Sequence, residues 1–287
     1  MKFLKIAPRN RPALAGILLC MSVLLPAHSS HAQEMRQWPL ELTVGHFIIH
    51  SDFQLLDKQA LATQLIGVTR QVEQLLKIST GGDKVHVVLF ETQEEYRKYM
   101  QNYFPDLPMR RALFIQDQGP GMLFAHWHSD IATDLRHEVS HAVVNASNGE
   151  IPLWVDEGIA EYFEVESQKR FRGSQHLPDV VRRSACGFVP QLSSLERIAA
   201  LGRFSTAHYR DSWSWIHYML HRNDRTRQLL VRYLAECRSG AKPLHLERQL
   251  SLVVGDVAQD YREHFSHFQH TATKAAQTQD NALDIGL

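Results

Sequence analysis

Two histidines near the middle of this chain constrain its fold more than any other feature. They belong to the segment His137-Glu138-Val139-Ser140-His141. Apolar residues recur around this segment at helical spacing, and a helix would place both histidines on one face. These apolar residues are Ile131, Leu135, Val139 and Ala142. Two imidazoles so placed can bind one metal ion, so we expect a metal site at the centre of the fold.

A second acidic segment follows after a short turn and offers further ligands. It contains Glu157 and Glu161. A catalytic zinc site needs a third protein ligand beside two histidines, and it keeps a fourth position open for water. Either glutamate could supply that third ligand. The pattern therefore predicts a catalytic Zn²⁺ site.

The overall charge does not point to a macromolecular partner. Lys plus Arg and Asp plus Glu are equal, at 31 each. This balance gives no reason to expect binding to nucleic acid or to an anionic membrane. The length of 287 residues permits one large domain or two small ones. A specific site must therefore carry the functional argument.

The first 32 residues have the pattern of a secretory signal peptide. Basic residues precede an apolar run over 13–25, which is short for a membrane span, and small residues precede Gln33. We expect cleavage there, export to the periplasm or the medium, and no integral membrane span in the mature chain. An uncleaved anchor is the alternative. A lipoprotein is less favoured, because Leu19 precedes Cys20 where a small residue is expected.

Export would leave two cysteines in an oxidising compartment. Cys186 and Cys237 could form a disulfide there if their Cα atoms lie close enough. The sequence leaves both the disulfide and the two free thiols open.

The periodicity of the chain predicts an α+β fold, with a small mixed sheet packed on the metal-binding helix. We expect strands within 38–50, turning at Gly45, and over 85–90, 111–116 and 122–127. We expect helices over 55–76, 92–103 and 153–165, and then over 192–201, 205–221, 225–237 and 254–268. The segment 169–190 is polar and interrupted, so a loop is expected there.

The same pattern divides the mature chain into three regions. Residues 33–166 would form an N-terminal part that carries the metal-binding helices. Residues 167–270 would form a helical C-terminal part, and 271–287 a flexible tail. A cleft is expected between the first two parts.

The central residues resemble those of a known family. Residues 137–141 and the segment 154–163, which reads Trp-Val-Asp-Glu-Gly-Ile-Ala-Glu-Tyr-Phe, are similar to the gluzincin metallopeptidases of the thermolysin-like and aminopeptidase-like group, and more closely to their bacterial peptidase-MA-like relatives. The resemblance implies that Glu157 is the third zinc ligand and that Glu161 braces a ligand histidine. Position 156 is Asp where aminopeptidase relatives usually have Asn, and the Gly-x-Met-Glu-Asn segment is missing, so exopeptidase activity is not implied.

The expected chemistry follows from these roles. Glu138 lies one position after His137, so its carboxylate can reach a zinc-bound water without being a ligand and would serve as general base. Zinc lowers the pKa of such a water to about 7. Relatives supply an oxyanion donor from a later helix. Tyr209 is the candidate here, with His208 and His217 as alternatives.

Two classes of function remain. The first is an exported zinc-dependent metallopeptidase, an endopeptidase acting on a peptide or protein substrate, or a related amidase acting at the cell wall. The second is a zinc-containing, non-catalytic binding or assembly factor of the cell envelope. Glu138 favours the enzyme, because a purely structural metal site has no use for a general base.

Overall fold

The computed structural model describes residues 38–55, 58–116, 119–146 and 149–268. The signal peptide predicted over 1–32 and the tail predicted over 271–287 lie outside the described residues. Export and cleavage therefore stay predictions.

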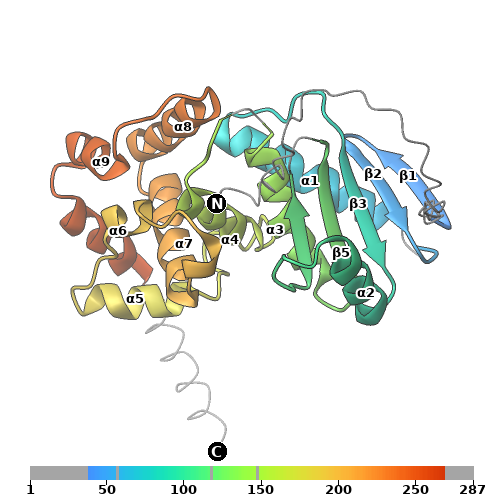
Figure 1. Cartoon of the computed structure of the whole chain (residues 1–287). Helices are drawn as coiled ribbons and strands as arrows, with labels where there is room; N and C mark the ends of the chain where they lie inside the picture. The colour runs from blue at the N-terminus through green and yellow to red at the C-terminus, as the bar shows by residue number, and fades with distance from the viewer. Residues whose placement is uncertain (1–37, 56–57, 117–118, 147–148, 269–287) are drawn as a thin grey trace, which may run out of the picture.

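A five-stranded mixed sheet forms one side of the molecule (Figure 1). Its strands are β1 (Leu40–Val44), β2 (Phe47–Ser51), β3 (Val85–Phe90), β4 (Ala112–Ile115) and β5 (Gly121–His126). The spatial order is β1-β2-β3-β5-β4, with antiparallel pairs at the two edges and parallel pairs between them. Gly45, at φ +57°, makes the tight turn between β1 and β2 as predicted. The predicted strands and the α+β class are confirmed.

Helices cover both faces of this sheet. On one face lie α1 (Lys58–Leu76) and α3 (Ile131–Val144), which pack against each other. On the other face lies α2 (Gln93–Tyr103), which begins at the Thr92 cap and contributes to a smaller apolar cluster. The apolar residues of α3 explain its position between the sheet and the other helices. Leu135, Val139 and Val144 are fully buried there.

The rest of the chain is helical. It comprises α4 (Leu153–Phe163), α5 (Leu177–Ala185), α6 (Leu192–Glu196), a 3₁₀ turn (Leu201–Arg203), α7 (Thr206–His221), α8 (Asp224–Arg238), α9 (Leu246–Val254) and a further helix over 257–268. Helix α4 packs along α7 and also contacts α3. It therefore links the sheet side of the molecule to the helical side, as Figure 1 shows.

Two predictions about the helical part were wrong, and one helix was not predicted. The segment 169–190 contains α5, although a loop was expected. Its Pro178 lies in the first helical turn, where the missing N–H has no intrahelical partner to lose, and Leu177, Val180 and Ser184 form its buried face. The helix expected over 192–201 ends at Glu196, and α9 was not predicted.

The two described cysteines are free. Cys186 is exposed and Cys237 is buried, so one thiol faces solvent while the other packs into the core. The disulfide that the sequence left open is not formed in this structure.

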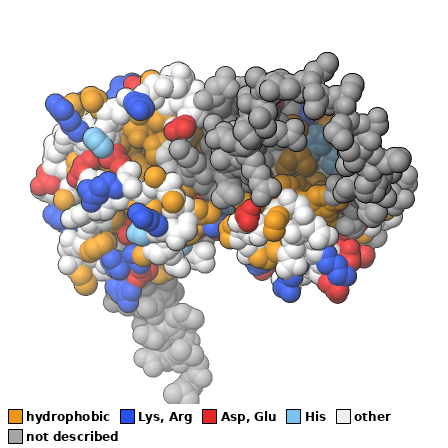
Figure 2. Space-filling view, viewed as in Figure 1, with side chains coloured by type: hydrophobic (Ala, Val, Ile, Leu, Met, Phe, Trp, Pro, Cys, Tyr) orange, Lys and Arg blue, Asp and Glu red, His pale blue; other side chains and the backbone are white. Residues whose placement is uncertain are grey.

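The surface agrees with the balanced composition. Figure 2 shows Lys and Arg interspersed with Asp and Glu over the helical part, without a large area of one sign on this face. Among the helices that the structure describes, none is sufficiently long and apolar to cross a membrane.

Candidate metal centre

Three side chains from α3 and α4 converge on one point. His137 and His141 project from the same face of α3, with their Nε2 atoms 3.0 Å apart. Glu157 reaches the same point from α4, and its Oε2 lies 3.6 Å from each of these nitrogens. All three residues are buried. The structure thus brings together the two predicted histidines and one of the two candidate glutamates.

A glycine fixes the position of Glu157. A Cβ atom built on Gly158 would lie 2.7 Å from the backbone oxygen of Ser212 and 2.8 Å from Cγ1 of Ile216, both on α7. Only glycine allows α4 to approach α7 this closely. The residue beside the predicted ligand therefore sets the distance between two helices.

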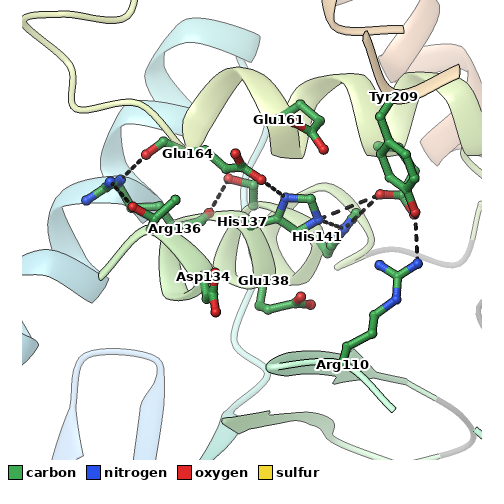
Figure 3. A network of polar contacts seen from close by, with 12 residues as sticks. Arg110, Asp134, Arg136, His137, Glu138, His141, Glu161, Glu164 and Tyr209 are labelled. Atoms are coloured by element: carbon green, nitrogen blue, oxygen red, sulfur yellow. Dashed lines mark hydrogen bonds and ion pairs between the residues drawn. The ribbon is translucent and has the colours of Figure 1, made fainter. Parts of the chain in front are cut away.

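Each histidine has a carboxylate at its other ring nitrogen. Glu164 Oε1 lies 2.8 Å from His137 Nδ1, a contact drawn in Figure 3. Asp156 Oδ2 lies 3.0 Å from His141 Nδ1, and Asp156 Oδ1 accepts a hydrogen bond of 2.8 Å from the Asn145 amide. With the Nδ1 protons directed at carboxylates, each Nε2 presents a lone pair to the centre.

The donor set fits a metal ion. Two imidazole lone pairs and Glu157 Oε2 would face one another within 3.0–3.6 Å, an arrangement that is repulsive without a cation. Glu157 Oε2 is buried and has no hydrogen-bond partner among the described residues. Two histidines and one carboxylate form the ligand set of several catalytic zinc sites. A zinc ion held by these three residues would satisfy the buried oxygen.

The charges at the centre favour a cation as well. Burial alone would lower the pKa of His137, but the nearby carboxylates of Glu157 and Glu164 raise that pKa well above the ordinary value. The same holds for His141: burial alone would lower its pKa, but Asp156 and Glu157 raise it. Burial would raise the pKa of Glu157, yet the two histidines lower it. The surrounding carboxylates thus attract positive charge to both rings.

Glu161 does not make the contact that the resemblance implied. Its Oε2 lies 2.8 Å from Nε2 of His176, at the start of α5. The bracing contact to His137 comes instead from Glu164, three residues later and just beyond the last turn of α4. In Figure 3 a dashed line joins Glu164 to His137 and none joins Glu161 to His137, although ligand atoms of His137, Glu161 and Glu164 all lie within 4.8 Å of one another. The two candidate ligand histidines are therefore contacted by Glu164 and Asp156.

Glu138 lies beside the centre and is held by the sheet. Its Oε2 accepts a hydrogen bond of 2.7 Å from the backbone N–H of Phe114, on edge strand β4. This bond fixes the orientation of the carboxylate and leaves Oε1 to interact with a group in the cleft. Glu138 is thus placed next to the metal ligands without belonging to the three converging atoms.

A cleft of about 370 Å³ opens over these residues. It is lined by Arg110, Arg111, Ala112, Asp134, His137, Glu138, Glu161, Glu164 and Tyr209. The lining comes from both sides of the molecule, since residues 110–112 precede or begin β4 and Tyr209 belongs to α7. The expected cleft between the two sides is therefore present.

Of the three candidate oxyanion donors, only Tyr209 lines this cleft. Its hydroxyl accepts a hydrogen bond of 2.8 Å from Nη2 of Arg110, as Figure 3 shows. Burial and the nearby Glu157 raise the pKa of Tyr209, and Arg110 opposes that rise. His208 caps α7 through Ser205, and His217 is buried against His264.

The sequence interpretation did not include Arg110. Its contact joins residues 99 positions apart, and no local pattern distinguishes this arginine from its neighbour Arg111. Asp156 and Glu164 were also not predicted as bracing residues. A signal for Asp156 was present, since it occupies the position where aminopeptidase relatives usually carry Asn.

The chain is similar to one protein family and to a solved structure. Residues 130–245 match a family described as "Protein of unknown function (DUF1570)". Among solved structures, the chain is similar to an M1 zinc metallopeptidase from Deinococcus radiodurans, with a TM-score of 0.38 and 14% identity. That match covers 80% of this chain and 50% of the other, so this chain spans half of that protein's length. A search of curated proteins found no match. Similarity at this level carries no argument about chemistry, so the function must be argued from the site.

Proposed function

We propose that this protein is an exported zinc-dependent endopeptidase. The observation that carries the proposal is the pairing of two features at the cleft that His137 and Glu138 line. His137, His141 and Glu157 converge on one buried point, and Glu138 lies beside them without joining them. A structural zinc site is closed and needs no additional acidic group. An open cleft with an oriented, uncoordinated carboxylate is the arrangement that hydrolysis requires.

Each residue has a distinct task in this proposal. A zinc ion held by His137, His141 and Glu157 would supply Lewis acidity, polarising a carbonyl and lowering the pKa of a coordinated water to about 7. Glu138 takes a proton from the attacking water at Oε1, because Oε2 is engaged by the N–H of Phe114. It then returns this proton to the leaving amine.

Tyr209 faces this arrangement from α7. When water adds to a carbonyl, negative charge develops on the carbonyl oxygen, and a prepositioned donor stabilises it. A tyrosine hydroxyl can donate one hydrogen bond while it accepts another. Tyr209 accepts from Arg110 and lines the cleft, so its own proton can serve the substrate oxygen.

The proposal is tested by measuring zinc content and proteolysis together. The chain lacking residues 1–32 should carry about one zinc per molecule and should cut internal bonds of a mixed peptide library. Chelation should abolish cleavage and added zinc should restore it. His141→Ala should lose both zinc and cleavage, whereas the control His208→Ala should keep both.

The same measurement separates the two classes of function. Tight zinc binding without hydrolysis of any peptide or cell-wall substrate would support the binding or assembly factor instead. An absence of zinc in the parent protein would contradict both. Detection of the mature chain outside the cytoplasm, with its N-terminus near Gln33, would test the export part of the proposal.

A further inference from the structure

We infer that Arg110 is a further functional residue of this cleft, a positioning residue that fixes the Tyr209 hydroxyl as a donor to the oxygen that gains charge during hydrolysis. The inference rests on the proposed function, because it assigns Arg110 a task in that reaction. Arg110 lies two residues before β4, and Tyr209 lies in the first half of α7. Their contact therefore spans the cleft.

The chemistry of the two groups sets the direction of their hydrogen bond. Nη2 of Arg110 lies 2.8 Å from the Tyr209 oxygen. A guanidinium group has five N–H donors and no acceptor, so the phenol oxygen must accept this bond. The proton of the Tyr209 hydroxyl must then point elsewhere. Since Tyr209 lines the cleft together with His137 and Glu138, that proton is available to an acceptor bound there.

The charge of Arg110 is not neutralised by direct contact with a carboxylate in the described part of the chain. Apart from Glu138, which accepts from the N–H of Phe114, the other charged groups of the lining are paired. Asp134 pairs with Arg111, Glu161 with His176, and Glu164 with His137. Hydrogen bonds from a charged donor are about twice as strong as those between neutral groups. Arg110 thus holds the phenol firmly and keeps positive charge beside it.

The adjacent arginine provides a matched control. Arg111 lines the same cleft, but its Nη2 lies 2.7 Å from Asp134 Oδ1 and its Nη1 3.5 Å from Asp130 Oδ2. Within the described part of the chain, Arg111 forms no hydrogen bond with Tyr209. Removing Arg111 therefore removes the same formal charge from the same cleft without removing the hydrogen bond to the phenol.

The test uses the zinc-loaded mature chain and a phosphoryl dipeptide, N-phosphoryl-Leu-Ala amide, whose tetrahedral oxygens mimic a hydrated carbonyl. Calorimetry measures the affinity of the parent protein and of its variants for this dipeptide. The single variants are Arg110→Met, Arg110→Lys, Arg111→Met and Tyr209→Phe. The double variant combines Arg110→Met with Tyr209→Phe. Loss of an oxyanion donor costs about 10²-fold or more, and we expect Arg110→Met to weaken binding by up to about 10²-fold, because the phenol donor is no longer held in place. Arg111→Met should stay within about 3-fold, and Arg110→Lys should fall between.

The double variant decides how Arg110 acts. If Arg110 works through Tyr209, the double variant should bind no more weakly than Tyr209→Phe alone. With a peptide that the parent cuts, Arg110→Met should lower kcat and leave KM nearly unchanged, because the interaction forms in the transition state. Zinc content and thermal melting of each variant confirm that the fold and the metal are retained.

Three results would overturn the inference. The first is an equal loss of phosphoryl-dipeptide affinity for Arg110→Met and Arg111→Met. The second is a double variant whose loss of affinity equals the sum of the two single losses. The third is a parent protein that cuts peptides but does not bind the phosphoryl dipeptide. Failure of the proposed function has a different signature. Its signature is a parent protein that cuts no peptide while its binding of the phosphoryl dipeptide still depends on Arg110 and Tyr209 together. That result would contradict the proposed endopeptidase activity. It would leave the inference that Arg110 positions Tyr209 intact.

Discussion

Glu164 Oε1 lies 2.8 Å from Nδ1 of His137 and thereby turns the opposite ring nitrogen toward His141 and Glu157. The contact joins the end of α4 to the middle of α3. A carboxylate in this position fixes the tautomer of a metal-binding histidine and raises its basicity. The geometry of the centre therefore depends on a residue outside the ligand set.

Glu164 and Glu161 should differ in their effect on zinc affinity. Glu164→Gln should weaken zinc binding by about 10- to 100-fold, which is typical for loss of such a partner. Glu161→Gln should weaken it less, because Glu161 contacts His176 instead of a ligand. Competition with a chelating dye measures both affinities. A larger loss for Glu161→Gln would restore the role that the family resemblance implied.

The close contact at Gly158 should make this position intolerant of a side chain. Gly158→Ala forces α4 away from α7, because the new methyl group would meet the backbone of Ser212. We expect a loss of about 1–3 kcal/mol in the free energy of unfolding, as for other overpacked cores. Zinc affinity should fall as well, since Glu157 moves with α4. Denaturant titration and the dye assay measure these two effects.

Gly67 is a matched control for this experiment. It also lies within a helix, α1, but a Cβ atom there would meet nothing within 4 Å. Gly67→Ala should leave zinc affinity unchanged and raise the free energy of unfolding by up to about 1 kcal/mol, from helix propensity. Equal behaviour of the two variants would mean that the approach of α4 to α7 does not position Glu157.

A second group of histidines should make the protein sensitive to acid. His217 Nδ1 lies 3.1 Å from His264 Nε2, and both rings are buried. Burial lowers the pKa of His264 to about 3 and that of nearby His221 to about 4. In the unfolded chain each would titrate near 6.5. Between these values the unfolded state binds more protons at these positions, so the contribution of His264 and His221 to stability falls as the pH drops below about 6.5.

The size of this effect can be measured on one residue. Between pH 7 and pH 5 a buried neutral histidine costs the folded state up to about 2 kcal/mol. His264→Gln should therefore reduce the dependence of the unfolding free energy on pH over this interval. His267→Gln, an exposed position on the same helix, should not reduce it. An unchanged dependence in His264→Gln would show that this ring is already protonated in the folded protein.

Sequence predicted those parts of the site whose residues lie close together along the chain. His137, Glu138 and His141 share one helix face, so spacing alone placed them together. The strands and the hairpin turn at Gly45 were predictable for the same reason. Glu164 and Arg110 were not, because their partners belong to other elements and are fixed by helix crossing and by the closure of the cleft.

The same reasoning explains the errors in the helical part. Helix α5 is short and contains Pro178, and its burial depends on the packing of α5 against α7. Polar composition and a proline favour a loop when each residue is considered locally. A short helix is not stable through its own sequence, and tertiary packing supplies the missing stability. The bracing role of Glu161 was implied by the family resemblance, and in the structure this carboxylate contacts His176.

The most direct test of the central claim concerns Glu138. This carboxylate lies beside the three converging atoms that could hold a metal and is oriented by the N–H of Phe114, but it is not one of the three. Glu138→Gln should therefore retain the zinc and the fold of the parent. Hydrolysis should fall by about 10²-fold or more, because the group that accepts the proton is lost.

The measurement is zinc content and cleavage of one peptide library by the parent and by Glu138→Gln, side by side. We expect equal zinc in both proteins, cleavage by the parent, and binding of the same peptides by the variant, which releases them intact. Equal cleavage by both proteins, or no cleavage by the parent together with full biological activity of Glu138→Gln, would contradict the catalytic role of this site.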